Sequence, residues 1–291
     1  MNDPKLSKRQ YWSAEEGYQY CEQIAHSHYE NFPVASWFIP KSMRKYVWAI
    51  YAFARTADDF ADEPGYSRAE RLDNLAQWDQ FLGECYSGNP THRIFAALAD
   101  TVERFQIPIE LFQNLLTAFK SDVTVNRYET FDQVLEYCRN SANPIGRLMM
   151  LLFNYRSESL LQRSDNICTA LQLANFWQDV SVDLEKDRIY VPMEDVREYG
   201  YSEEQLLRCM FTEQFRSLMA FEVRRTAELF VEGHPLLSQV GKDLSFELKL
   251  TWNGGTTILQ KIHRQNYNVL KKRPALGTWD KVSLLFRSIF M

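Results

Sequence analysis

Apolar residues recur every three to four positions along almost the whole chain, the spacing that places them on one face of an α-helix. Proline, glycine and capping residues separate these periodic stretches. The stretches predicted to be helical are 13–31, 41–63, 67–85, 91–105, 108–120, 131–140, 144–155, 164–183, 202–232, 235–270 and 279–290. No strand-like alternation extends beyond about four residues, and no repeat or Gly/Ser linker divides the sequence. The pattern predicts one all-α domain covering residues 1–291.

Several connections between these helices have their own signals. Pro144 is predicted to break or kink the run at 131–155, because proline removes a backbone donor. Gly254 and Gly255 are predicted to interrupt the run at 235–270. Residues 122–127 predict a turn, and residues 187–192 predict an extended loop.

The helix predicted at 164–183 carries polar side chains along an otherwise apolar run. Gln172, Asn175, Asp179 and Asp183 are three, four and four residues apart, so they stack along one helix face. Buried carboxylates are costly unless another group pairs with them. Because Mg²⁺ prefers a few carboxylates together with substrate phosphate oxygens, this face favours a metal–diphosphate site.

A second helix, predicted at 41–63, repeats the arrangement. Asp58 and Asp62 are four residues apart, Asp59 lies beside them, and Arg55 and Tyr51 precede them at intervals of about one helical turn. One such pair is typical of a solvated helix face. Two pairs, each inside a largely apolar helix, favour metal binding, and we expect them to clamp one metal–diphosphate cluster.

Composition narrows the class of protein. The 45% hydrophobic and 14% aromatic content supplies an ample core, and the net charge of −5 without a basic block argues against a nucleic-acid partner. The five scattered cysteines include no Cys-x-x-Cys pair, which suits a reducing compartment and offers no zinc site. None of the eleven glycines forms a dinucleotide-binding G-x-G-x-x-G motif.

The chain ends carry no targeting or spanning signal. The N-terminus lacks the apolar run of a secretory signal, and no stretch approaches the roughly 18 apolar residues of a membrane span. The apolar segment 282–291 contains Arg287 and is interpreted as a core-packing helix, with contact to a membrane surface as the alternative. We therefore expect a cytoplasmic protein, either free or peripherally associated with the inner membrane, with no obligate protein partner.

Four segments resemble the signature regions of the squalene and phytoene synthase family. IYAFARTADDFAD at 50–62 resembles its first aspartate-rich motif, and LQLANFWQDVSVDLEKDRIYVP at 171–192 its second. YCEQIAHSHYENFPVASWFIP at 20–40 is similar to its N-terminal helix, and YCRNSANPIG at 137–146 to its central Tyr-Cys segment. Within the family, the sequence resembles most closely the bacterial hydroxysqualene synthases of hopanoid biosynthesis.

The resemblance implies an isoprenoid (terpenoid) synthase fold, with helices around a central cavity. It also implies bound Mg²⁺, with Mn²⁺ as a substitute, and a prenyl diphosphate substrate. The hydroxysqualene branch ionises presqualene diphosphate, rearranges the cation and captures it with water, without NADPH. The alternative within the family is condensation of two farnesyl diphosphates to presqualene diphosphate, squalene or phytoene.

The resemblance also assigns roles to individual residues. Those matching the metal ligands are Asp58, Asp62, Asn175, Asp179 and Asp183. Those matching substrate-binding groups are His28, Arg55, Gln172, Arg188 and Tyr190. Those matching the cavity wall are Tyr51, Phe32, Tyr137, Ala142, Ile145, Gly146 and Phe176. A plain core role is the alternative for Phe176 and a structural role for His28, while Asp122 suits an outer metal-site acid or a turn cap equally.

The sequence departs from the family pattern at several places, among them Trp177 in place of an aliphatic residue and Asn143-Pro144 in place of a pair of small residues. Gln178 stands where many relatives carry an arginine, and Gly254-Gly255 stands where relatives carry a bulky tyrosine. The family's late basic diphosphate contact has no assigned position, although Arg264, Lys271 and Arg273 lie in the right region. These departures favour the handling of one diphosphate over the condensation of two.

The aspartate motifs also bear on two other classes of function. A non-catalytic assembly factor of the same fold should have lost metal ligands, whereas all five are present here. A chain-elongating trans-prenyltransferase is suggested by Asp-Asp-x-x-Asp at 58–62, but the second motif lacks a doubled aspartate.

Overall fold

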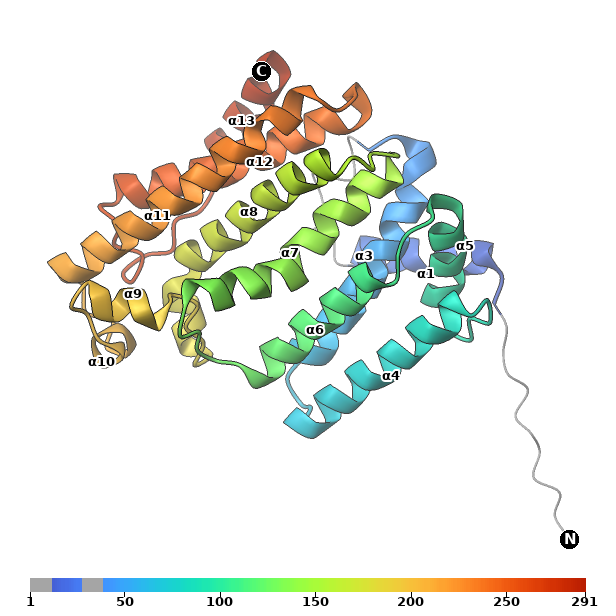
Figure 1. Cartoon of the computed structure of the whole chain (residues 1–291), viewed down its shortest axis with the longest axis horizontal. Coiled ribbons are helices and arrows are strands. Elements are labelled where there is room, and N and C mark those ends of the chain that lie inside the picture. The colour runs from blue at the N-terminus through green and yellow to red at the C-terminus, as the bar shows by residue number, and fades with distance from the viewer. Residues whose placement is uncertain (1–11, 28–38) are drawn as a thin grey trace, which may run out of the picture. The chain divides into compact units, whose positions relative to one another are not determined.

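The structure, a computed structural model, describes residues 12–27 and 39–291. It divides into two compact units, Met1–Val123 and Thr124–Met291 (Figure 1). The prediction that residues 1–291 form a single domain stays a prediction.

The first unit is built from helices that pack around aromatic side chains. Its helices are α1 (Ala14–Ser27), α3 (Lys41–Asp62), α4 (Arg68–Tyr86), α5 (Arg93–Phe105) and α6 (Glu110–Thr124). Helix α3 lies against α1, α4 and α5, and its Phe53 ring contacts the rings of Trp78, Phe95 and Phe112. Since Phe53 is fully buried, this inner face of α3 fixes which way its opposite, acidic face points.

The second unit is organised around the longest helix. Its elements are α7 (Phe131–Leu152), α8 (Glu158–Glu185), α9 (Met193–Glu198), α10 (Glu203–Leu207), α11 (Glu213–Gly233), the short 3₁₀ helix η1 (His234–Ser238), α12 (Lys242–Arg264) and α13 (Thr278–Phe290). Helix α8 packs against α7, α11 and α12, and α7, α8 and α11 run side by side in Figure 1. Trp177 of α8 is fully buried and donates its indole N–H to Thr226 Oγ1 of α11 at 2.8 Å.

The predicted break at Pro144 and the predicted interruption at Gly254-Gly255 are wrong, whereas a kink at Pro144 agrees with the structure. Helix α7 continues through Pro144, and its ribbon bends in Figure 1 without breaking. Helix α12 continues through Gly254 and Gly255, because Gly255 serves close packing. A Cβ at Gly255 would lie 2.4 Å from the Phe230 ring and 2.7 Å from the Leu171 side chain.

Other element boundaries also differ from the prediction. The run 202–232 is two helices, α10 and α11, separated where Cys209 adopts a positive φ of 50° and Thr212 caps α11. Helix α6 continues to Thr124, so the first half of the predicted turn at 122–127 is helical. Helix α9 has no counterpart among the predicted elements. The extended loop at 187–192 is confirmed in outline, since Ile189 forms a bridge with Arg127.

All five cysteines are free thiols, as their spacing indicated. Among the helices at described positions, none combines the length and apolarity needed to cross a bilayer.

Candidate active site

On the acidic face of α3, one arginine side chain forms ion pairs with two carboxylates. Arg55 Nη1 lies 3.2 Å from Asp58 Oδ2, and its Nη2 pairs with Asp59. The Asp58 side chain is about half exposed and Asp62 is exposed, while Arg55 is largely buried. Burial raises the pKa of the Tyr51 phenol, with Arg55 opposing the shift and Asp59 and Asp58 adding to it. Four predicted site residues of this unit therefore share one helix face: Tyr51, Arg55, Asp58 and Asp62.

The polar face of α8 is half-buried at three of its four positions and exposed at one. Gln172, Asp179 and Asp183 are half-buried and Asn175 is exposed. Burial, and secondarily the neighbouring Asp179, raise the pKa of Asp183 to about 7, and Arg188, Lys186 and Arg273 oppose the shift. Two carboxylates one turn apart repel each other here, and a divalent cation is the partner that would relieve the repulsion.

A cation from a distant segment reaches this face. Arg273, in the segment after α12, pairs with Asp179 through Nε and donates from Nη2 to Asp179 Oδ2 at 3.0 Å. The same segment is tied to α8 by Gln178, whose buried amide donates to the carbonyl of Pro274. Of the three cations considered for a late basic contact, Arg273 is the one that contacts the aspartate motif.

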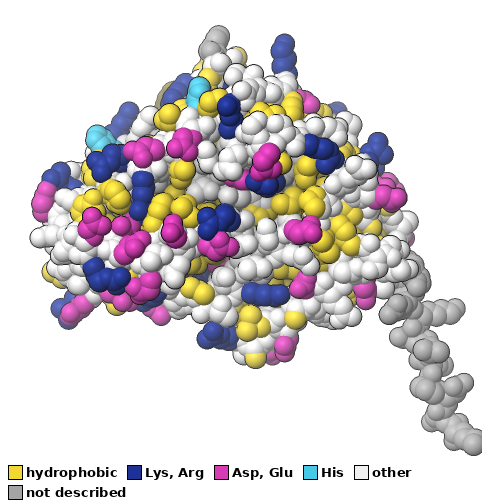
Figure 2. Space-filling model, in the orientation of Figure 1, with side chains coloured by type: hydrophobic (Ala, Val, Ile, Leu, Met, Phe, Trp, Pro, Cys, Tyr) yellow, Lys and Arg dark blue, Asp and Glu magenta, His cyan; other side chains and the backbone are white. Residues whose placement is uncertain are grey.

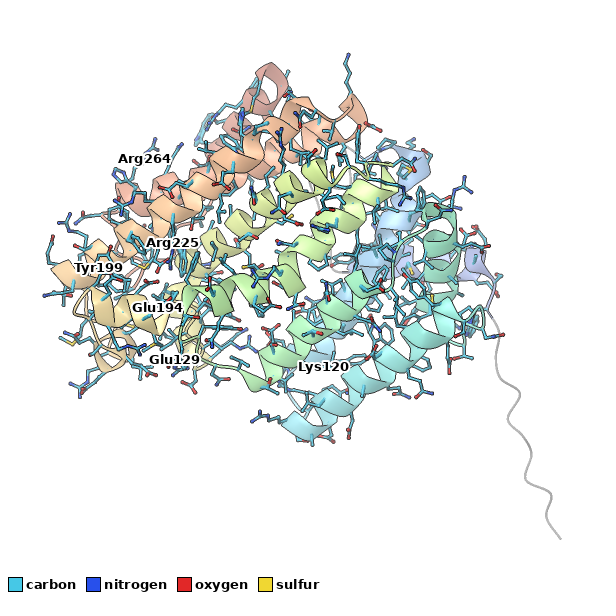
Figure 3. The ribbon with its side chains drawn as sticks, in the orientation of Figure 1. Lys120, Glu129, Glu194, Tyr199, Arg225 and Arg264 are labelled. Atoms are coloured by element: carbon cyan, nitrogen blue, oxygen red, sulfur yellow. The ribbon has the colours of Figure 1, made fainter. Side chains whose placement is uncertain are left out.

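The segment after α8 is anchored against the start of the second unit. Ile189 N donates to Asn126 O, Met193 N to Tyr128 O and Glu194 N to Glu129 O, each at 2.9 Å. Glu129 and Glu194 are labelled in Figure 3. Arg127 secures the turn before this pairing by donating to the carbonyl of Asp187 at 2.5 Å and pairing with its carboxylate. The anchoring fixes Arg188 and Tyr190, two predicted diphosphate groups, beside the end of α8.

An aromatic cluster adjoins these polar groups. The rings of Phe176 and Tyr190 stack with centroids 3.7 Å apart and planes within 8°. Tyr137 lies with its ring 5.8 Å from each of them, and Tyr128 stacks on Tyr190 at 5.6 Å. Phe176, Asp183, Arg188 and Tyr190 also line one narrow crevice. The structure thus brings predicted cavity residues and predicted diphosphate residues together within the second unit.

The remaining predicted residues lie in different surroundings. Ala142 is half-buried and Ile145 is exposed on α7. Gly146 lies where α7 approaches α8, since a Cβ there would be 2.5 Å from Cys168 Sγ and 2.6 Å from Ser164 Oγ. Close helix packing accounts for this glycine, and its role in a cavity wall stays a prediction. His28 and Phe32 lie outside the described residues.

Sequence reasoning missed three residues that shape the site. Arg127 ends the stretch 122–127 that is interpreted as a turn, Tyr128 follows it without a predicted role, and Arg273 is one of three cations left undecided. No signal in the sequence pairs Arg127 with Asp187, because the exposed carboxylate of Asp187 does not require a partner. Nothing local in the sequence indicates that Arg273 pairs with a residue 94 positions earlier.

Each of the two helix faces, taken by itself, offers the ligand type that Mg²⁺ prefers. The face of α3 offers carboxylate oxygens, and the face of α8 offers carboxylate oxygens and one amide oxygen. Across residues 12–27 and 39–291, no three His, Cys, Asp or Glu side chains converge tightly enough to form a metal cage.

Comparison with known proteins extends over most of the chain. The profile of the family described as squalene/phytoene synthase matches residues 25–280. A phytoene synthase from Arthrospira platensis is 27% identical over 283 residues, which cover 93% of this chain and 91% of that protein. A 15-cis-phytoene synthase from Synechococcus elongatus is 26% identical over 294 residues, which cover 97% and 95%.

Solved structures agree with this result. The crystal structure of squalene synthase HpnC from Alicyclobacillus acidocaldarius matches with a TM-score of 0.84 and 36% identity, over 88% of this chain and 96% of that one. A dehydrosqualene synthase solved with a ligand matches with a TM-score of 0.84 and 24% identity, over 95% and 96% of the two chains, which supports the fold alone. The all-α isoprenoid synthase fold expected from the sequence is confirmed.

Proposed function

Because this chain belongs to the squalene/phytoene synthase family, whose members act on prenyl diphosphates, we propose that it converts presqualene diphosphate to hydroxysqualene. The carbon–oxygen bond to diphosphate breaks, and diphosphate leaves with the bonding electrons. The cyclopropyl ring of the resulting cation opens, and water adds its oxygen to the allylic carbon and loses a proton. The products are hydroxysqualene, diphosphate and H⁺, so no reductant is consumed.

The polar residues of both units suit the departure of diphosphate. Mg²⁺ bound by Asp58 and Asp62 and by Asn175, Asp179 and Asp183 would neutralise the charge that develops on the leaving group. The guanidinium groups of Arg55, Arg188 and Arg273 suit bidentate contact with phosphate oxygens. Arg55 and Arg273 are already paired with the acidic motifs, so each is oriented where diphosphate and metal would arrive.

The aromatic cluster suits the carbocation. Each ring face attracts a nearby cation by very roughly 0.5–2 kcal/mol without offering a nucleophile. Tyr137, Phe176 and Tyr190 present stacked and tilted rings beside Asp183 and Arg188. These rings would protect the cation from premature attack, so that the position of water determines the product.

The observation that favours the lyase reaction is the environment of Gln178. The position that carries an arginine in many relatives holds a buried amide whose donor is used by the carbonyl of Pro274. Gln178 therefore supplies no charge to a second diphosphate. The nearest replacement cation, Arg273, is paired with Asp179. These cations are therefore better suited to binding one diphosphate than to binding two.

Product analysis by gas chromatography–mass spectrometry tests the proposal. Purified protein receives presqualene diphosphate and Mg²⁺, with and without NADPH, alongside a parallel reaction with farnesyl diphosphate. We expect a triterpene alcohol from presqualene diphosphate whether or not NADPH is present, and no product from farnesyl diphosphate. If presqualene diphosphate stays intact with Mg²⁺ present, the proposal is wrong.

A matched pair of variants on α8 separates catalysis from general damage. Asp179→Asn removes a proposed metal ligand and should lower kcat/KM about 100-fold or more, since an interaction made to the developing charge is lost. Glu185→Gln removes an exposed acid near the end of the same helix and should leave kcat/KM within about twofold.

The second candidate is condensation of two farnesyl diphosphates. It is favoured by the phytoene synthases from Arthrospira platensis and Synechococcus elongatus, which match nearly the whole chain. Presqualene diphosphate or a C30 hydrocarbon appearing from farnesyl diphosphate would establish this transferase reaction. The argument from Gln178 would then be wrong.

A further inference from the structure

The last helix of the chain exposes its apolar side. Trp279, Val282, Phe286 and Ile289 are 87%, 40%, 60% and 61% exposed. They are three, four and three residues apart, so they form one stripe along α13; we refer to these four residues as the outer face of α13. A surface helix normally shows polar residues to solvent, and a contiguous apolar stripe marks an interaction surface.

The opposite side of α13 packs against α12, and this packing determines which side of α13 faces solvent. Leu284 and Ser288 are buried, and Asn253 Nδ2 of α12 donates to Ser288 Oγ at 3.1 Å. Lys261 Nζ of α12 pairs with Asp280 Oδ2 at 2.6 Å. These contacts leave the outer face on the side of α13 turned away from α12.

A hollow of about 430 Å³ adjoins this helix within the second unit. Its walls come from α11, α12 and α13 and include Phe230, Val231 and Trp252. Arg264 and Arg287, both exposed, lie in the lining, and Arg264 is labelled in Figure 3. An apolar hollow with guanidinium groups in its lining matches an acyl chain that ends in a phosphate.

Charge is distributed unevenly along the chain. Residues 261–291 contain seven Lys and Arg but only one acid, Asp280, a local charge of +6 in a protein whose total is −5. Lys281 and Arg287 flank the outer face on α13 itself. The face of the molecule drawn in Figure 2 mixes side chains of both signs with scattered apolar side chains. Of the cations at 261–291, Lys281 and Arg287 lie beside the apolar stripe and Arg264 lies in the lining of the hollow, whereas Arg273 and Lys261 are paired with Asp179 and Asp280.

We propose that the outer face of α13, together with Lys281, Arg287 and the adjoining hollow, docks the protein on an anionic phospholipid membrane. A short helix with an apolar face and flanking cations lies in the plane of the interface, with its apolar side among the acyl chains. Tryptophan prefers the headgroup level, and Lys and Arg attract anionic headgroups. We infer a membrane surface as the partner because flanking cations would strengthen binding to anionic headgroups but not binding to a purely apolar partner.

Co-sedimentation with vesicles tests the proposal on the full chain. Vesicles of phosphatidylcholine with about 30 mol% phosphatidylglycerol should bind the protein, and vesicles of phosphatidylcholine alone should bind it about tenfold less or weaker. Raising the salt concentration should weaken the binding. The fluorescence of Trp279 should shift to the blue on binding, and the Trp279→Phe variant should lack that part of the shift.

Variants at exposed positions identify the face. Trp279→Ser with Phe286→Ser should lower vesicle partitioning by about tenfold per side chain, and Lys281→Gln with Arg287→Gln by about tenfold or more in total. Leu207→Ser with Met210→Ser is the matched control, since these residues are 49% and 43% exposed near α10; it should bind vesicles as the unchanged protein does. Circular dichroism and gel filtration check that each variant is folded.

Three results would overturn the proposal: no binding to anionic vesicles, equal binding by the Trp279/Phe286 variant, or loss of binding in the control. Light scattering after gel filtration adds a further decision. If the unchanged protein is a dimer that the Trp279/Phe286 variant breaks, without any vesicle binding, the outer face is an interface between two copies and the membrane proposal fails.

Discussion

At position 178 one amide replaces the charge expected from the family pattern and holds a loop in place. Gln178 donates to the carbonyl of Pro274, and the neighbouring Arg273 pairs with Asp179. Gln178→Met keeps the size of the side chain but removes the donor, leaving a buried carbonyl without its partner. We expect a loss of about 1–3 kcal/mol in unfolding free energy, measured by urea unfolding.

The same variant should weaken diphosphate binding, because Arg273 loses its anchored neighbour. Isothermal titration with diphosphate and Mg²⁺ would show the change in Kd. The exposed Glu185→Gln is the control for both measurements. Unchanged stability together with unchanged Kd would mean that the contact between Gln178 and Pro274 has no part in placing Arg273.

A second residue gives the protein a dependence on pH that is separate from the candidate site. Glu222 of α11 is fully buried and shares Arg225 (labelled in Figure 3) with Asp195 of α9. Burial raises the pKa of Glu222 from 4.5 to about 8, with Arg225 opposing the shift and Asp195 adding to it. Between these values the folded state binds more protons than the unfolded state, so stability should fall as pH rises from 4.5 toward 8.

Glu222→Gln should flatten this dependence, because an amide cannot ionise. Urea unfolding at pH 5.5 and at pH 8 would measure the difference in free energy of unfolding for each variant. The exposed Glu228→Gln on the same helix should keep the slope of the unchanged protein. Asp183, whose pKa is also raised to about 7, should leave part of the slope in place, so an unchanged slope in Glu222→Gln would contradict the role given to Glu222.

Among the helices, two adjacent glycines of α12 behave oppositely. A Cβ at Gly254 would meet no atom within 4 Å, whereas one at Gly255 would lie 2.4 Å from the Phe230 ring. Gly254→Ala should stabilise the helix by up to about 1 kcal/mol through helix propensity. Gly255→Ala should destabilise the protein by about 1–3 kcal/mol through overpacking.

Thermal unfolding of the two variants measures this contrast, and each serves as the other's control. Equal effects in both would contradict the packing of α12 described here. The open space beside Gly254 also bears on a departure from the family pattern, since relatives carry a bulky tyrosine in this region. Gly254 has room for a larger side chain and Gly255 does not, so Gly254 is the one of the two positions at which a larger side chain can be accommodated.

Helices were predictable from the sequence where local signals decide them. The apolar face of α3 and the capping box of Ser67 and Glu70 on α4 each depend only on residues that are close together in the sequence. The signals failed where tertiary contacts override them. Pro144 stays within α7 and Gly255 within α12 because each helix is packed along its length against α8, whereas the start of α11 is set by Thr212 after a positive φ at Cys209.

At the scale of the molecule, the fold class and the two acidic motifs followed from periodicity and spacing. The grouping of Tyr128, Tyr137, Phe176 and Tyr190 did not, because it depends on the pairing of residues 126–129 with 189–194. Such a pairing joins short extended segments about 60 positions apart, and each is too short for a recognisable strand pattern. The contact from Arg273 to Asp179 fails to show in the sequence for the same reason.

If both acidic motifs serve one metal–diphosphate ligand, that ligand must stabilise the whole chain against unfolding. Ligand at about 100 times its Kd adds about 2.7 kcal/mol to the free energy of unfolding. We expect Mg²⁺ with diphosphate to raise Tm, and EDTA to abolish the shift. Asp58→Asn with Asp62→Asn should remove it, and so should Asp179→Asn with Asp183→Asn.

The controls are Asp73→Asn and Glu185→Gln, one exposed acid from each unit, and both should keep the full shift. A pure scaffold would show no stabilisation by Mg²⁺ and diphosphate, which separates an enzyme from an assembly factor of the same fold. If the Asp58/Asp62 variant keeps the shift while the Asp179/Asp183 variant loses it, the first motif binds no metal in this complex. The ligand would then be held by α8 and the groups around it, Asp58 would act only through its pairing with Arg55 or at a later step, and Asp62 only at a later step.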